Sequence, residues 1–301
     1  MTNDSPRQLC LIAPPYLDTL KKIERHQTLD KKDAAQILSY IENDLLPLML
    51  ERFAQKPHSM LGASLGHLLN AVNCAVLLER SPPEIWHYLE LFKTVAVCHF
   101  RFGSGAAPFT ATINGTTLHF VPEAHSEYMY LDNWVTATDV CILLGDRESL
   151  SFLTTLTEDD FSNDNYTKQE NHFNREYYQF IRTFLNNQQN SENFLTAAIA
   201  AAIQPQDNPL RTKFVNLICY PQLRLLQELI AGDVQAFNEQ LYLALTAHQQ
   251  FWTQETHIYN PKGWISLKLL ATCAIAVESQ NFTIEVKSDY IPPFLANCRR
   301  C

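Results

Sequence analysis

The chain has 301 residues, of which 46% are apolar, and its formal net charge is −9 at pH 7. A negative surface repels nucleic acid and anionic membranes and attracts basic proteins, so direct nucleic-acid binding is disfavoured. The chain contains 8 glycines, which also disfavours nucleotide-binding α/β folds, because these folds need glycine in tight turns and beside phosphates. The composition therefore favours helices joined by short loops.

The N-terminal sequence MTNDSPRQLCLIAPPYL has neither the basic start nor the long apolar run of a secretory signal. No stretch reaches the roughly 18 uncharged apolar residues of a membrane helix. We therefore expect a soluble, cytoplasmic protein that does not bind a membrane. Most of the eight cysteines occur singly within apolar helical patterns, so we expect reduced and buried thiols: Cys10, Cys74, Cys98, Cys141, Cys219, Cys273, Cys298 and Cys301.

Apolar residues at spacings of three and four predict helices through the first half of the chain. After an irregular lead-in over residues 1–29, Asp30 is the expected N-cap of a helix with Ile37 and Ile41 on its apolar face. Pro47 predicts a bend or a boundary in this helix, because proline lacks the N–H that a helical hydrogen bond needs. Further helices are predicted at residues 59–79, 82–102, 131–144 and 147–156.

Residues 109–121, FTATINGTTLHFV, change to the two-residue period that is typical of a β-hairpin. Asn114–Gly115 is the dipeptide that a type I′ turn favours. This turn predicts three cross-strand pairs, which place apolar residues on one face: Phe109 with Phe120, Ala111 with Leu118, and Ile113 with Thr116.

A polar segment, residues 157–176, has six acidic residues against Lys168 and Arg175 and is the expected boundary between two parts. The N-terminal part, residues 1–156, is helical with the hairpin as an insertion. The C-terminal part, residues 157–301, is also helical, and we expect both to form one compact unit. Its predicted helices cover residues 173–187, 191–203, 211–231, 233–256 and 262–279, with a last helical turn after Pro293.

The predicted fold class is mainly α, a multi-helix bundle or helical array. The β-structure is limited to one hairpin near residues 109–121 and a short strand near residues 282–286. In that strand the alternation of Phe282, Ile284 and Val286 with polar residues predicts one buried face.

Motifs that suggest chemistry have simpler structural explanations. Gly62-Ala63-Ser64-Leu65-Gly66 matches the nucleophile elbow, but that motif needs a preceding strand and a parallel sheet, and neither is predicted. Small residues that let two helices approach explain the same pattern. Cys298 and Cys301 have metal-ligand spacing without two further ligands nearby. His248 lies on an apolar helical stripe, so it is expected to be a hydrogen-bonded core residue. We predict no catalytic residue, cofactor or metal.

The C-terminal third carries motifs of a known family, in the order Tyr220-Pro221, Gly232-Asp233, Phe237-Asn238, Ala244…His248…Trp252, Gly263–Leu267 and Ile284–Pro292. With these motifs the chain resembles the immunity protein 49 family, bacterial antitoxins of polymorphic toxin systems. Trp134-x-x-Ala137 and Leu144–Glu148 are weaker matches upstream. The resemblance implies a mostly helical, non-enzymatic protein that is encoded beside a toxin gene. Such a protein binds its cognate toxin and neutralises it by steric occlusion.

Seven residues are candidates for partner binding. Four belong to an acidic segment that suits a basic partner, such as a nuclease toxin, but that is also compatible with a solvated loop. Three near the C-terminus have no evident structural role, so either partner contact or internal hydrogen bonding explains them. The candidates are Glu158, Asp159, Asp160, Asp164, Glu285, Asp289 and Tyr290.

Two other functions stay open from the sequence. A helical adaptor would bind several partners weakly, and a serine hydrolase would use Ser64 as its nucleophile. Neither has a constellation of residues that supports it beyond the general helical pattern.

Overall fold

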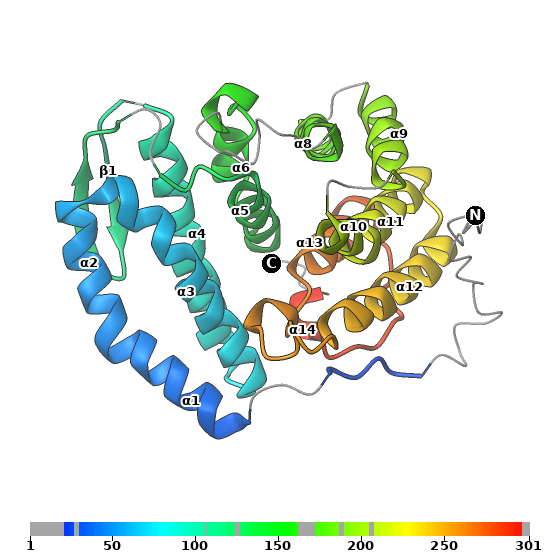
Figure 1. Cartoon of the computed structure of the whole chain (residues 1–301), viewed down its shortest axis with the longest axis horizontal. Coiled ribbons are helices and arrows are strands. Elements are labelled where there is room, and N and C mark those ends of the chain that lie inside the picture. Colours follow the sequence, from blue (N-terminus) through cyan, green and yellow to red (C-terminus); the bar gives the residue numbers. More distant parts are fainter. Residues whose placement is uncertain are drawn as a thin grey trace, which may run out of the picture.

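The computed structural model describes residues 21–26, 30–105, 107–123, 127–161, 172–186, 190–204 and 208–296. Figure 1 shows two groups of helices, with α1 to α6 and a β-hairpin in one group and α8 to α13 in the other. The groups meet where α5 packs against α13, and α3 also contacts the turn that precedes α13. The mainly α fold class is therefore confirmed.

The helices of the first group are α1 (Lys31–Tyr40), α2 (Leu46–Gln55), α3 (Pro57–Leu77), α4 (Pro82–Gly103), α5 (Leu131–Leu144) and α6 (Arg147–Leu153). Those of the second group are α8 (His172–Leu185), α9 (Ser191–Ala202), α10 (Pro209–Phe214), α11 (Tyr220–Ala231), α12 (Val234–Trp252), α13 (Leu267–Gln280) and α14 (Pro293–Ala296). Single 3₁₀ turns occur at Glu158–Phe161 and Pro261–Gly263.

Several helices begin or end at residues with a clear local reason. The Asp30 carboxylate accepts the N–H of Asp33, which confirms Asp30 as the N-cap of α1. Ser81 and Glu84 form a capping box at the start of α4. Gly232 ends α11 with a φ of 75°, a left-handed conformation that glycine adopts without strain.

Pro47 and Pro221 each follow a π-helical turn. Ile41–Leu45 is π-helical just before Pro47, and Val215–Cys219 is π-helical just before Pro221. Proline cannot donate the helical hydrogen bond, and its ring clashes with the carbonyl four residues earlier. The wider turn accommodates that carbonyl, so α1 and α2 form a nearly continuous path in place of two separated helices.

The β-hairpin, β1 (Phe109–Ile113) and β2 (Thr116–Phe120), has the predicted register, with Phe109 opposite Phe120. The two rings stack with centroids 5.0 Å apart, and Phe120 also contacts Phe102 of α4 edge to face. This apolar face therefore attaches the hairpin to the helices.

The predicted strand at residues 282–286 is wrong, although its alternation of buried and exposed residues is as expected. The segment is extended but has no partner strand among the described residues. Instead, the side chain of Asn238 donates to the carbonyl of Thr283 and accepts the N–H of Glu285. One buried amide side chain of α12 thus makes the hydrogen bonds that a neighbouring strand would make.

The β-bridge of this region lies further along the chain. Ile23 pairs in parallel with Ser288, through the Ile23 N–H to Lys287 and the Asp289 N–H to Ile23. The segment of residues 21–26 is therefore fixed against the C-terminal region, more than 260 positions away in the sequence.

Buried side chains from both groups of helices form a continuous core. α3 is long and apolar enough to cross a membrane, but 72% of its apolar window is buried within the protein, as in the core helix of a globular domain. Five cysteines on these helices are buried and free, as predicted: Cys74, Cys98, Cys141, Cys219 and Cys273. Cys10, Cys298 and Cys301 lie outside the described residues.

Candidate functional site: a polar pocket between the two groups of helices

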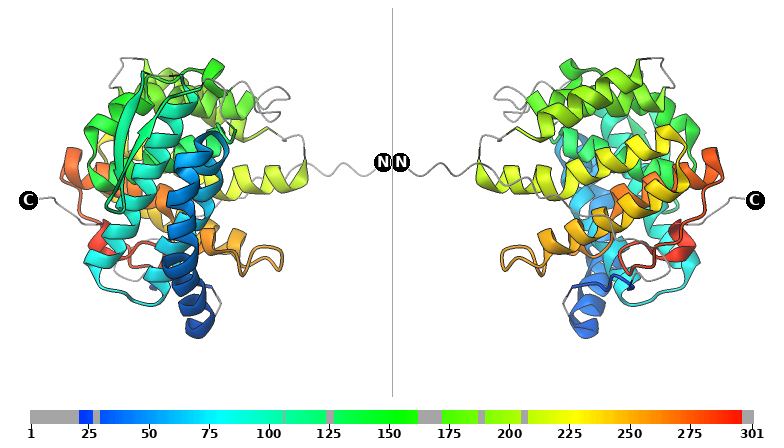
Figure 2. Two further views of the ribbon diagram at one scale, coloured as in Figure 1. Left: turned by 90° about the vertical axis from the view of Figure 1, so that its left-hand side faces the viewer. Right: turned by 90° about the vertical axis from the view of Figure 1, so that its right-hand side faces the viewer.

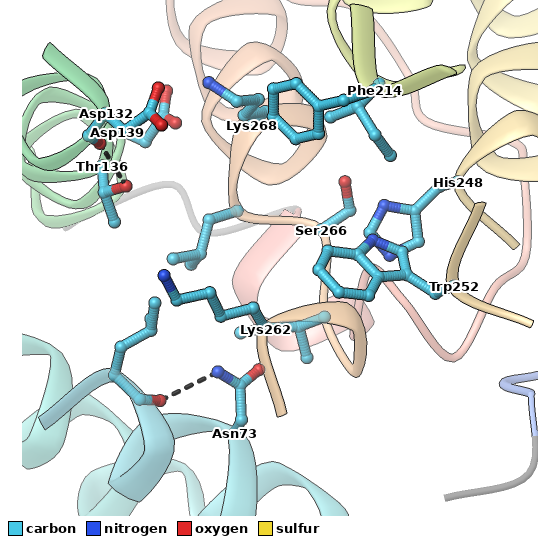
Figure 3. A pocket seen from close by; sticks show the side chains of 14 residues that line it. Asn73, Asp132, Thr136, Asp139, Phe214, His248, Trp252, Lys262, Ser266 and Lys268 are labelled. Carbon is cyan, nitrogen blue, oxygen red and sulfur yellow. Dashed lines mark hydrogen bonds between the residues drawn. The ribbon is translucent and has the colours of Figure 1, made fainter. Parts of the chain in front are cut away.

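A pocket of about 190 Å³ lies where α3, α5, α12 and α13 come together. Phe214 at the end of α10 and Lys262 in the turn before α13 also line it. Figure 3 shows its polar side chains, which come from both groups of helices. The packing of residues far apart in sequence therefore creates a site that no single motif contains.

The α5 wall carries Asp132, Thr136 and Asp139 at helical spacing, so all three lie on one face. Asp139 is 6% exposed and forms no ion pair within the described part of the chain, and it lines the pocket. Burial raises the pKa of Asp139 to about 6, and the attraction of Lys268 offsets this only in part. An unpaired, buried carboxylate is costly in free energy, which is unusual for a purely structural residue.

The α13 wall carries Lys268, which points toward the carboxylates of Asp132 and Asp139 without forming an ion pair. Its Nζ donates instead to the hydroxyl of Tyr177 at 3.3 Å and lies 5.2 Å from the centre of that ring. The Tyr177 hydroxyl in turn donates to Gln222. Burial opposes the charge of Lys268, but Tyr177 and Asp139 outweigh it and raise its pKa. Lys268 is therefore charged and held beside α8.

Asn73 contributes an acceptor from α3. Its Nδ2 donates to the carbonyl of Leu69 at 2.8 Å, which fixes the orientation of the amide. Its Oδ1 is buried and has no hydrogen-bond partner in the described structure. Because Asn73 is 1% exposed and borders the pocket, this oxygen is a second unpaired acceptor at the site.

His248 and Trp252 of α12 form the aromatic side of the pocket (Figure 3). His248 Nε2 lies 3.0 Å from the carbonyl of Gly263, and since a carbonyl only accepts, Nε2 carries the proton. Burial lowers the pKa of His248 to about 3, so the ring is neutral. This confirms the prediction of a hydrogen-bonded core histidine. A Cβ on Gly263 would clash with the Trp252 ring, which explains the glycine.

Tyr290 lies behind this aromatic wall. It is fully buried, and its ring contacts His248 edge to face at 4.7 Å. Its hydroxyl accepts the backbone N–H of His26 at 2.9 Å and is 2.8 Å from the ring Nδ1 of the same residue. Tyr290 therefore makes internal hydrogen bonds, one of the two explanations that the sequence allowed, and does not reach the surface.

Asp289 also makes internal contacts. Its carboxylate pairs with Lys22 at 2.5 Å and accepts the backbone N–H of Arg25. Burial opposes ionisation of Asp289, but Lys22 and Arg25 outweigh it and lower the pKa of the carboxyl. Arg25 further donates to the carbonyl of Trp264. The side chain of Glu285, by contrast, is exposed, and its possible contact with a partner stays a prediction.

We expect Tyr290→Phe to lower the free energy of unfolding by about 1–3 kcal/mol, because the buried groups of His26 lose their partner. Urea unfolding of the purified protein measures this. Tyr259→Phe is the matched control, since Tyr259 is 56% exposed, and it should change stability by less than about 0.5 kcal/mol. Equal stability of the two variants would contradict a role for the Tyr290 hydroxyl.

Two carboxylates of the acidic segment before α8 bind other residues of the protein. Glu158 pairs with Arg175 and accepts from Gln179, both on α8, and Asp160 accepts the N–H and the hydroxyl of Thr157. Asp159 is exposed. Asp164 lies outside the described residues. Among the described carboxylates of this segment, Glu158 and Asp160 are partly buried and Asp159 is exposed, and contact of Asp159 with a partner stays a prediction.

Ser64 lies within helix α3, so it is not at the turn between a strand and a helix that a nucleophile elbow requires. Its hydroxyl donates to the carbonyl of Met60, and it is 1% exposed. A Cβ on Gly62 would lie 2.5 Å from Tyr128, so this glycine serves close packing, whereas Gly66 has open space. No group of three or more potential metal-ligating side chains occurs in the ranges that the structure covers.

The family model of immunity protein 49 matches residues 80–295. The chain belongs to the immunity protein 49 family. A search of the curated proteins and a search of the solved structures returned no significant match. The matched range contains every pocket residue except those of α3.

The family motifs that are separate in sequence contact one another in space. His248 and Trp252 pack on Gly263, Tyr290 packs on His248, and Asn238 holds the extended segment 282–286. These contacts form the aromatic side of the pocket and the layer behind it. The immunity protein 49 motifs therefore have a shared structural role in shaping this region.

The sequence prediction missed Asp132, Asp139, Lys268 and Asn73. The available signal was Asp139 itself, because an acidic residue within the apolar run VTATDVCILL is unusual in a buried helix. That signal does not reveal which lysine lies opposite, because α13 is more than 120 positions away.

Proposed function

We propose that this protein is an immunity protein that binds a cognate bacterial toxin in the cytoplasm of the producing cell and neutralises it by steric occlusion. The observation that carries this proposal is the family match over residues 80–295. The family name suggests an immunity role, and the toxin and the mode of inhibition are our inference.

The charge of the chain supports a basic partner. With 32 acidic against 23 basic residues, the protein attracts cationic proteins over long range and accelerates their capture. A nuclease toxin has this character, because its substrate groove must bind phosphates. Fast capture suits an inhibitor that has to intercept a toxin before it acts.

Protection of a cell requires a tight complex. A nanomolar dissociation constant corresponds to about −12 kcal/mol, and stable complexes bury on the order of 1,600 Å². Within such an interface a few aromatic or arginine side chains contribute most of the free energy. The interface therefore needs at least one pocket or surface that accepts such an anchor.

The test is co-expression in one cell with the toxin encoded by the adjacent gene. We expect full growth with the immunity protein and growth arrest without it, and a purified one-to-one complex with a dissociation constant of about 1 nM or lower. Raising the salt concentration should slow association much more than it accelerates dissociation. Growth arrest despite folded, abundant immunity protein would overturn the proposal. Association with many unrelated proteins instead would favour a helical adaptor.

A further inference from the structure

The pocket contains acceptors for which the described residues supply no donor. Asn73 Oδ1 from α3 is fully buried and has no hydrogen-bond partner among the described residues. Asp139 from α5 is 6% exposed and lies opposite Lys268 without forming an ion pair with it. Asp132 adds an exposed carboxylate about two helical turns before Asp139. Buried acceptors are stable when a donor binds them, so two independent elements present groups that require N–H donors.

The positive groups of the pocket are less available to a ligand. Lys268 already binds the hydroxyl and the ring of Tyr177. Lys262 is exposed to solvent, and His248 is neutral and bound to Gly263. The buried donor of the pocket that has no partner among the described residues is Trp252 Nε1, which is neutral. A cation instead meets the carboxylates of Asp132 and Asp139, which form no ion pair there, although it has to share the attraction of Asp139 with Lys268.

The size of the pocket limits the ligand. Sites for drug-sized molecules have volumes of about 300–1,000 Å³, and this pocket of about 190 Å³ fits one long side chain. Phe214 and Trp252 line the pocket on the side away from α5, and such apolar surface suits the methylene stem of a long cationic side chain. Figure 2 shows α10 and the segment 253–263 projecting on the same side of the protein, and both contribute residues to the pocket.

We propose that this pocket receives an arginine side chain of the toxin, whose guanidinium is bound by Asp132 and Asp139 on the α5 side, opposite the aromatic wall with Trp252. Arginine suits the site better than lysine because its five N–H donors serve several acceptors at once. Deeply seated arginines are also among the residues that contribute most to protein interfaces. This inference rests on the proposed immunity function and names the chemistry of its contact.

The probe is Nα-acetyl-L-arginine amide, which carries the side chain without charged backbone groups. It is titrated into the full-length, ¹⁵N-labelled protein and followed by NMR. We expect the indole N–H signal of Trp252, assigned with Trp252→Phe, to shift. The signal of Trp134, which is bound to the Leu153 carbonyl away from the pocket, should not move.

Single substitutions identify the residues that bind the probe. Asp139→Asn should weaken the probe about tenfold, the effect of losing one charge-assisted hydrogen bond, and Asp132→Asn should weaken it in the same direction. Asp132 is exposed, so its variant tests the same contact without the change in stability that Asp139→Asn causes. Asp159→Asn, an exposed carboxylate outside the pocket, is the matched control and should leave the affinity unchanged.

Three results would overturn the proposal. The first is no shift of Trp252 at saturating probe, and the second is a larger response to Nα-acetyl-L-glutamate amide. The third is tenfold tighter binding of free L-arginine than of the blocked probe, which indicates a small-molecule site. Since the probe experiment needs no toxin, its failure leaves the immunity function standing. If probe binding succeeds but neutralisation fails, the toxin is excluded as the source of the arginine.

Discussion

Trp134→Ala is expected to lower the free energy of unfolding by about 4 kcal/mol, a large part of the 5–15 kcal/mol that is typical of a globular protein. Trp134 is fully buried on α5, and its ring contacts Phe161 and Tyr178 edge to face. Its Nε1 donates to the carbonyl of Leu153 at 2.9 Å. The substitution removes a large ring, leaves a cavity and orphans a buried carbonyl.

Urea unfolding followed by circular dichroism measures this loss. Trp134→Phe separates the contributions, because it keeps an aromatic ring but cannot donate to Leu153, and should cost about 1–3 kcal/mol. Trp86→Ala is the control for removal of a tryptophan at a partly buried site, with a smaller expected loss. If Trp134→Ala and Trp86→Ala are equally stable, the cluster around Trp134 does not hold α5, α6 and α8 together.

Asp139→Asn is expected to stabilise the protein at pH 7 by up to about 3 kcal/mol. Burial raises the pKa of this carboxyl from 3.8 to about 6, and each unit corresponds to about 1.4 kcal/mol. The ionised carboxylate is therefore unfavourable in the folded protein, despite the charge of Lys268 opposite. A neutral amide of the same shape removes this cost.

The pH dependence of this gain has a defined sign. Between about pH 4 and 6 the folded protein binds more protons at Asp139 than the unfolded chain does, so this residue destabilises the fold progressively as the pH rises. The stability difference between Asp139→Asn and wild type should therefore be largest near pH 7, be small near pH 4 and approach zero below it.

Comparing the two proteins at each pH isolates this effect, because the other groups that face the pocket are the same in both: Asp132, Tyr177, His248, Lys262 and Lys268. Thermal or urea unfolding at pH 4, 5, 6 and 7 provides the profile. A variant that is less stable than wild type at pH 7 would show that the Asp139 carboxylate has a structural partner. Asp159→Asn at an exposed site is the control and should give no pH-dependent difference of this kind.

The two predictions separate a buried residue that stabilises the fold, Trp134, from a buried residue that destabilises it, Asp139. Trp134 has a hydrogen-bond partner and close ring contacts, so its removal weakens the fold. Asp139 forms no ion pair in the described structure, so replacing it with asparagine is expected to stabilise the fold. Residues that reduce stability are common at binding sites, where the unfavourable state is relieved when the ligand binds. This contrast is why the pocket, and not the aromatic core, is the candidate contact site.

Local patterns were sufficient to predict most of the helices and the hairpin. The period of apolar residues located the helices, and Asn114–Gly115 fixed the strand register, because the conformations of adjacent residues decide both features. The motifs along the chain likewise indicated the family, and the match over residues 80–295 confirms the family. The start of α13 was predicted too early, since Pro261–Gly263 forms a separate turn first.

Only the tertiary structure decided features that depend on distant partners. Residues 282–286 alternate like a strand, but the side chain of Asn238 binds them, and a periodic pattern cannot distinguish these partners. Tyr290 proved to be buried against His26, a residue 264 positions earlier. The pocket, too, exists because α5 and α13 pack together, and side-chain packing between remote helices has no signature in the local sequence. Sequence alone therefore determined the elements and the family of this protein, and the folded chain determined where charge is left unpaired.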